Sequence, residues 1–202
     1  MRILSFIILI LLSGLNLWAQ EGSADDVLNP TYDYDTTLKA GYSISFKVDD
    51  ELQYLYLKKG SRVIAEIASV SKGELTKTLG YKGADFTGYF VLVHSHGGGN
   101  PHYIELIKKS TGKNILKNGA AWIDADEKRE MLLFCDKDVP GKSDKMILLN
   151  IRTGQKQLFA FPADIFTEPQ VLNRIKIRSL TSQRLVISYE TEKGVKVKTY
   201  NL

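Results

Sequence analysis

The sequence predicts an all-β fold of antiparallel β-meanders with little helix. After Gly41 the chain consists of short runs rich in Val, Ile, Tyr and Phe, separated by Gly, Pro, Asn and Asp roughly every ten residues. No window of ordinary helix length has an apolar period of about 3.6 residues, although residues 163–173 can hold a short helical turn. The expected strands are residues 42–48, 53–58, 63–70, 89–94, 103–108, 131–135, 146–151, 157–161, 175–179, 184–189 and 195–200.

The first 19 residues match a secretory signal peptide. Arg2 is followed by the apolar run 3–12 and then by residues 13–19, which include the small residues Ser13 and Gly14 and end at Ala19. This run is too short to cross the roughly 30 Å of hydrocarbon in a bilayer. We therefore expect cleavage after Ala19, no transmembrane anchor after cleavage, and a periplasmic or extracellular location.

The remaining chain is expected to have a polar leader or linker at residues 20–39, followed by one β-rich domain at residues 40–202. Of the 27 Lys and Arg residues, 26 remain after Arg2 is removed, against 23 Asp and Glu, so the net charge is +3. Because both signs are interspersed, the charge does not favour nucleic-acid binding. The single cysteine, Cys135, lies in an apolar run and is expected to be a buried, inert thiol.

An internal repeat adds to the prediction. Residues 103–116 and 145–158 each hold a strand, a Thr-Gly turn and a second strand, and the two Thr-Gly pairs are 42 positions apart. Weaker copies lie around residues 53–70 and 184–202. A period in the low forties is the size of one four-stranded propeller blade, so the chain has room for about four blade-like units.

One of these units resembles a known family. Residues 121–134, followed by 145–159, resemble a blade of the TolB-type and WD-repeat-like β-propellers, in which an aromatic residue and an Asp-containing turn precede an apolar strand. The resemblance covers one blade well and a second in part, and it implies a propeller-like scaffold. The usual Pro-Asp-Gly turn is Ala125-Asp126-Glu127 here, and such propellers usually have more blades. A closed four-bladed ring, an open meander and a two-sheet β-sandwich therefore all remain open.

All three histidines lie within nine residues, at positions 94, 96 and 102. On an extended segment His94 and His96 point to the same face, and His102 can return as a third ligand if the intervening Gly-rich stretch is a hairpin tip. Three imidazoles with an open position would make a catalytic zinc site. The alternative is an ordinary hairpin loop with solvated histidines.

Tyr54 and Tyr56 are a second candidate site. They share one face of an expected strand and can form a binding platform for a sugar or a peptide. Their alternative role is cross-strand packing, because strands are enriched in aromatic residues.

The sequence contains no complete nucleophilic, phosphate-binding or cysteine-containing metal motif. This favours an exported, non-catalytic module that binds a protein or a cell-envelope ligand and needs no cofactor. Two alternatives are a metal-dependent hydrolase that uses His94, His96 and His102 with zinc, and a self-assembling structural protein.

Overall fold

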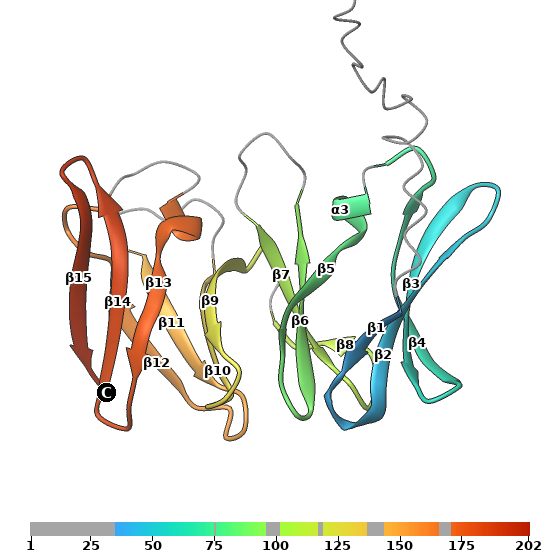
Figure 1. The fold of residues 1–202 in the computed structure, drawn as a ribbon, viewed down its shortest axis with the longest axis horizontal. Helices are drawn as coiled ribbons and strands as arrows, with labels where there is room; N and C mark the ends of the chain where they lie inside the picture. Colours follow the sequence, from blue (N-terminus) through green and yellow to red (C-terminus); the bar gives the residue numbers. More distant parts are fainter. Residues whose placement is uncertain (1–34, 75, 96–101, 117–118, 137–143, 166–170) are drawn as a thin grey trace, which may run out of the picture. The chain divides into compact units, whose positions relative to one another are not determined.

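The computed structural model describes residues 35–74, 76–95, 102–116, 119–136, 144–165 and 171–202. The fold in these residues is all-β, and every strand pairing is antiparallel, as the sequence predicts (Figure 1). The expected signal peptide, residues 1–19, and most of the expected leader lie outside the described residues.

The strands form four successive meanders. The first meander is a separate sheet in which four strands pair in chain order: β1 (Asp35–Leu38), β2 (Tyr42–Val48), β3 (Leu52–Lys59) and β4 (Arg62–Ser71). The short 3-10 helix η1 (Lys39–Gly41) links β1 to β2, and the α-helix α3 (Thr76–Leu79) follows β4.

The second and third meanders belong to one sheet, in which a single bridge pairs Tyr103 with Ala121. The second meander contains β5 (Tyr81–Asp85), β6 (Tyr89–His94), β7 (Tyr103–Lys108) and β8 (Lys113–Asn114). The third contains β9 (Ala121–Asp126), β10 (Met131–Cys135), β11 (Lys145–Asn150) and β12 (Lys156–Ala160). The fourth meander is a three-stranded sheet of β13 (Lys176–Leu180), β14 (Arg184–Thr191) and β15 (Gly194–Asn201), preceded by the 3-10 helix η2 (Val171–Arg174).

Each expected strand coincides with a strand of the structure to within two residues. The sequence prediction missed β1, β5, β8 and β9. Three of these strands contain Asp, and β5 and β9 also contain Gly or Ala, which are depleted in strands. The remaining one, β8, has only two residues. The composition of β1, β5 and β9 is therefore unfavourable for a strand. Pairing with neighbouring strands stabilises them.

The β-rich region begins earlier than residue 40. Residues 35–38 of the expected leader form β1, and Leu38 is 3% exposed within the apolar core. Pairing of β1 with β2 outweighs the acidic composition of this segment. At the other end, part of the expected helical turn forms η2, while residues 166–170 lie outside the described part of the chain.

Three apolar clusters pack consecutive meanders together face to face. Leu57 and Leu92 belong to the first cluster, between the first and second meanders. Val91 and Phe134 belong to the second cluster, between the second and third meanders. The third cluster joins the third and fourth meanders, and its buried residues are Ala121, Ile123, Leu133, Cys135, Met146, Leu148, Phe159, Val171, Leu172, Ile175, Leu180, Leu185, Ile187 and Tyr189.

The two inner meanders bury both faces. Consecutive residues of a strand point to opposite sides, so Val91 and Leu92 enter different clusters. This is why the runs 90–93 and 132–135 are continuously apolar rather than alternating. The layers are compatible with a β-sandwich, and no sheet closes on itself within the described strands.

The 42-residue repeat is visible in the backbone hydrogen bonds. The amide of Gly112 donates to the carbonyl of Lys108 at 2.8 Å, and that of Gly154 donates to the carbonyl of Asn150 at 2.8 Å. The two glycines have φ of 71° and 74°, a conformation that L side chains rarely adopt. The repeated Thr-Gly pair is therefore a repeated turn.

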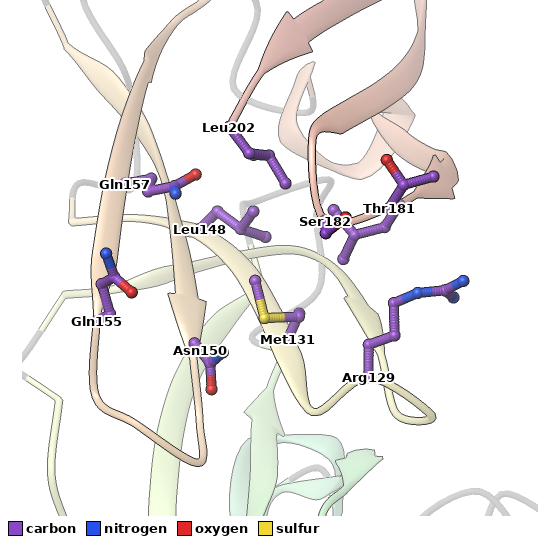
Figure 2. Close-up of a pocket in the computed structure, with 10 residues that line it drawn as sticks. Arg129, Met131, Leu148, Asn150, Gln155, Gln157, Thr181, Ser182 and Leu202 are labelled. Atoms are coloured by element: carbon purple, nitrogen blue, oxygen red, sulfur yellow. The ribbon is translucent and has the colours of Figure 1, made fainter.

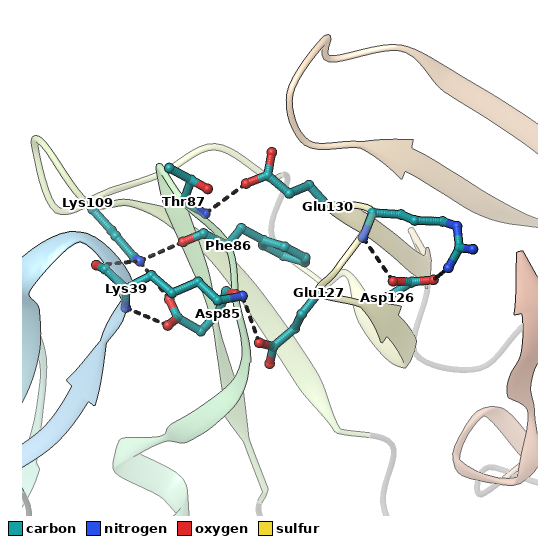
Figure 3. Close-up of polar contacts among 9 residues, drawn as sticks. Lys39, Asp85, Phe86, Thr87, Lys109, Asp126, Glu127 and Glu130 are labelled. Atoms are coloured by element: carbon teal, nitrogen blue, oxygen red, sulfur yellow. Dashed lines mark hydrogen bonds and ion pairs between the residues drawn. The ribbon is translucent and has the colours of Figure 1, made fainter. Parts of the chain in front are cut away.

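A buried ion pair within the second meander also contacts the backbone of Lys39 in the first meander (Figure 3). Lys109 is 1% exposed, and its Nζ lies 2.6 Å from Oδ1 of Asp85. The same ammonium donates to the carbonyls of Phe86 at 2.6 Å and Lys39 at 3.1 Å. The backbone N–H of Lys39 donates to Oδ2 of Asp85 at 2.6 Å. These contacts join η1, β5 and the turn after β7 at one point.

We predict that Asp85→Asn destabilises the protein by about 3–5 kcal/mol, because it leaves the Lys109 ammonium buried without a counter-charge. Glu127→Gln is the matched control, since it removes the exposed ion pair of Glu127 with Lys39 (3.0 Å; side chains 43% and 44% exposed). The control should cost less than about 1 kcal/mol. Guanidinium unfolding of both variants measures the difference, and equal losses would contradict a dominant role for the buried pair.

Candidate functional site

A cleft of about 390 Å³ lies between the third and fourth meanders (Figure 2). This volume falls in the range of roughly 300–1,000 Å³ that is typical of ligand sites. Two sheets and the turn between β13 and β14 contribute to it. Its lining residues are Arg129, Met131, Leu148, Asn150, Gln155, Gln157, Leu180, Thr181, Ser182 and Leu202.

The floor of the cleft is one face of the sheet formed by β10, β11 and β12. Met131 pairs with Asn150, and Leu148 pairs with Gln157, so these four side chains share a face. The same face carries the apolar residues of the third cluster. The cleft therefore begins where that cluster ends, at the end of the sheet next to the Thr153-Gly154 turn.

Amides and hydroxyls form the polar walls. Gln155 and Gln157 come from the β12 side, and Thr181 and Ser182 come from the β13–β14 turn opposite (Figure 2). The hydroxyl of Thr181 accepts the backbone N–H of Arg184 at 3.0 Å and so fixes this turn. The amide oxygen of Asn150 likewise accepts backbone N–H groups of the following turn.

Gln157 differs from these neighbours. Its Oε1 is buried and has no hydrogen-bond partner within the described part of the chain. A buried acceptor without a partner costs roughly 1–3 kcal/mol, and such groups are rare in native structures. Gln157 also lines the cleft, so an acceptor without a described partner lies in the cleft wall.

The charge in the cleft is balanced. Arg129 has the only charged side chain in the described lining, and its Nη1 lies 2.9 Å from Oδ2 of Asp126. Its backbone N–H also donates to Oδ1 of the same carboxylate at 2.9 Å. Because the guanidinium is already paired, the arrangement suits an uncharged ligand.

The structure does not bring His94 and His102 to one face. His94 pairs with Tyr103 across β6 and β7, so these two residues share a face, and His102, one position away, points to the other. A metal site shared by all three imidazoles stays a prediction. His96 lies outside the described residues, so a site made of His94 and His96 stays a prediction. No group of three or more potential metal-binding side chains occurs among the residues that the structure describes.

Both ring nitrogens of His94 have neighbours. Nδ1 lies 2.9 Å from the carbonyl oxygen of Thr78, and Nε2 lies 3.6 Å from Oε1 of Glu105. Burial of the ring lowers the pKa of His94, but the pairing with Glu105 and the contact with Thr78 outweigh burial, so the pKa is raised. The carboxylate of Glu105 and the carbonyl of Thr78 therefore favour the protonated form of the ring.

The structure brings Tyr54 and Tyr56 together. Their ring centroids are 5.8 Å apart with an angle of 24° between the rings, on the face opposite Leu55 and Leu57. The hydroxyl of Tyr54 donates to Oδ2 of Asp49 at 2.7 Å, which raises the pKa of Tyr54 to about 12. The ammonium of Lys47 lies 5.7 Å from the ring centroid of Tyr56. These contacts support cross-strand packing, and ligand binding by this pair stays a prediction.

Sequence reasoning missed the cleft residues. Gln157 and Ser182 come from separate meanders, and neither belongs to a motif with a known spacing. The sequence signals nearby were those of the expected strands and of the Thr153-Gly154 turn, and they indicated structure rather than a site. For Cys135 the expected burial is confirmed, and the inertness of its thiol stays a prediction.

We predict that Glu105→Gln lowers the pKa of His94, because it removes the carboxylate that favours the charged ring. A raised folded-state pKa stabilises the fold below the unfolded pKa of about 6.5, and this contribution is lost as the pH rises through the folded pKa. The native chain should therefore lose more stability between about pH 5.5 and 8.5 than the variant does. Imidazole NMR titration and urea unfolding at both pH values measure this, with Glu192→Gln as an exposed-charge control. An unchanged His94 titration in the Glu105 variant would refute it.

No protein-family model and no curated protein matches the chain. Among the helices that the structure describes, none has the length and apolar composition needed to cross a membrane.

Proposed function

We propose that the chain is an exported, non-catalytic binding module whose ligand site is the cleft between the third and fourth meanders. The observation that carries this proposal is the lining of the cleft. An apolar floor, with Met131 and Leu148, lies between walls of amide and hydroxyl groups. Such a combination of apolar surface with a few directed polar groups is typical of binding sites.

The chemistry of the lining favours binding over catalysis. Carboxamides and aliphatic hydroxyls do not ionise in the physiological range, so they hold a ligand by hydrogen bonds rather than transfer protons. Within the described lining, no acid–base pair or activated nucleophile lies beside them. The residues seen in the cleft therefore support recognition rather than bond cleavage.

The scaffold we propose is propeller-like. Four meanders follow one another in the chain, consecutive meanders pack face to face, and the repeated turns are 42 residues apart. These features agree with the blade resemblance of residues 121–134. The signal-peptide pattern of residues 1–19 supports export.

The test blocks the cleft without disturbing the core. Ser182 is exposed and lines the cleft, so Ser182→Trp fills part of it, whereas Ser110→Trp adds the same side chain at an exposed turn elsewhere. The purified, signal-cleaved chain is screened for saturable binding to arrays of uncharged peptides and of cell-envelope glycans. We expect binding to at least one array and a loss of at least about tenfold in affinity, equivalent to ~1.4 kcal/mol, in the Ser182 variant only.

Equal affinity of the two tryptophan variants, or no saturable binding to either array, would overturn the assignment of the cleft. Circular dichroism and unfolding midpoints of both variants establish that each is folded before binding is compared.

A further inference from the structure

The orphan acceptor of Gln157 indicates one property of the ligand. Its Oε1 is buried and lacks a partner in the described residues, while its backbone belongs to the regular pairing of β11 with β12. A ligand that places an N–H or O–H donor there would gain a hydrogen bond and remove a desolvation cost already present in the free protein. The ligand is therefore expected to carry a hydrogen-bond donor.

Two ligand classes fit the rest of the lining less well. Arg129 is already paired with Asp126, so no unpaired cationic side chain in the described lining is offered to an anionic group. None of the described lining residues is aromatic, so a sugar ring would have no stacking partner among them. An uncharged ligand with aliphatic and amide-like groups agrees better with both facts.

The position of β12 adds a second indication. It is the outermost strand in the order β12-β11-β10-β9, so one of its edges has no neighbouring strand among the described residues. An exposed edge can accept an extended peptide, whose backbone pairs with the strand while alternate side chains enter pockets. Gln155, just before β12, and Gln157, within it, line the cleft, so the edge and the cleft are adjacent.

We propose that the cleft binds an uncharged, extended polypeptide segment, with an aliphatic side chain on the floor near Met131 and Leu148 and a backbone N–H donated to Oε1 of Gln157. This inference rests on the proposed function, because it names the ligand class of the same site. Carboxamide groups such as those of Gln155 and Gln157 pair with a peptide backbone both as donors and as acceptors.

The experiment uses capped pentapeptides in which Thr alternates with an aliphatic residue, and a matched series in which one backbone amide at a time is N-methylated. We expect methylation at one position to weaken binding about tenfold, which corresponds to ~1.4 kcal/mol. Gln157→Leu should weaken binding of the unmethylated peptide by a similar factor, and methylation at that position should then cost nothing more.

The same variant has a second readout. Because Gln157→Leu removes an unpaired buried acceptor, the thermal midpoint of the free protein should rise while peptide affinity falls. A merely structural glutamine would give a lower midpoint instead. If the variant does not fold, the methylation series on the native chain still tests the proposal, since uniform tolerance of methylation would refute it.

The outcomes separate the two proposals. Glycan binding that Ser182→Trp abolishes, without any peptide binding, would overturn the peptide inference and keep the binding-module function. Peptide binding that is insensitive both to methylation and to Gln157→Leu would also overturn the inference. Absence of binding to both ligand classes would overturn the proposed function itself.

Discussion

The burial of both faces of the second and third meanders is the constraint on which the remaining architecture depends. Because Val91 and Leu92 enter opposite clusters, the second meander needs an apolar neighbour on each side, and the same holds for the third, with Leu132 and Leu133. Neither inner meander can be stable alone, since one exposed face would cost roughly 1.5–3 kcal/mol for each large aliphatic side chain left in water. The first and fourth meanders supply the covering faces.

Polar contacts then fix how the apolar layers meet. Apolar packing is non-directional, so it permits neighbouring layers to shift, whereas Lys109 has fixed acceptors at Asp85 and Phe86. The pair is weak evidence for net stability, because desolvating two charges offsets much of their attraction. Its more direct consequence is geometric. The ammonium also reaches the carbonyl of Lys39, so the first meander has one position in which all these groups are satisfied.

Sequence analysis predicted the strands that are apolar runs between turn residues. It missed the strands that depend on contacts with residues distant in the sequence. The strand around Val91 and that around Leu133 are apolar runs between turn residues, and their positions were predicted to within two residues. By contrast, β9 contains two Asp residues, which are depleted in strands. The carboxylate of Asp124 accepts the backbone N–H of Ile177, in the fourth meander, at 2.7 Å. Such a long-range partner leaves no local pattern. The histidine prediction also depends on register, and it stays a prediction because His96 lies outside the described residues.

The cleft follows from a change of composition along single strands. On the face of β11 that meets the fourth meander, Met146 and Leu148 are followed by Asn150, and on β12 Phe159 is preceded by Gln157. Apolar packing holds the two meanders together only as far as these aliphatic and aromatic residues extend. Beyond them, amides face the hydroxyls of the β13–β14 turn, and close contact would bury polar groups without partners. The space between the layers is therefore a consequence of the alternating pattern itself. A polar position that would be a defect in a closed core becomes, at the open end of the same sheet, the group that we propose as the contact for a ligand.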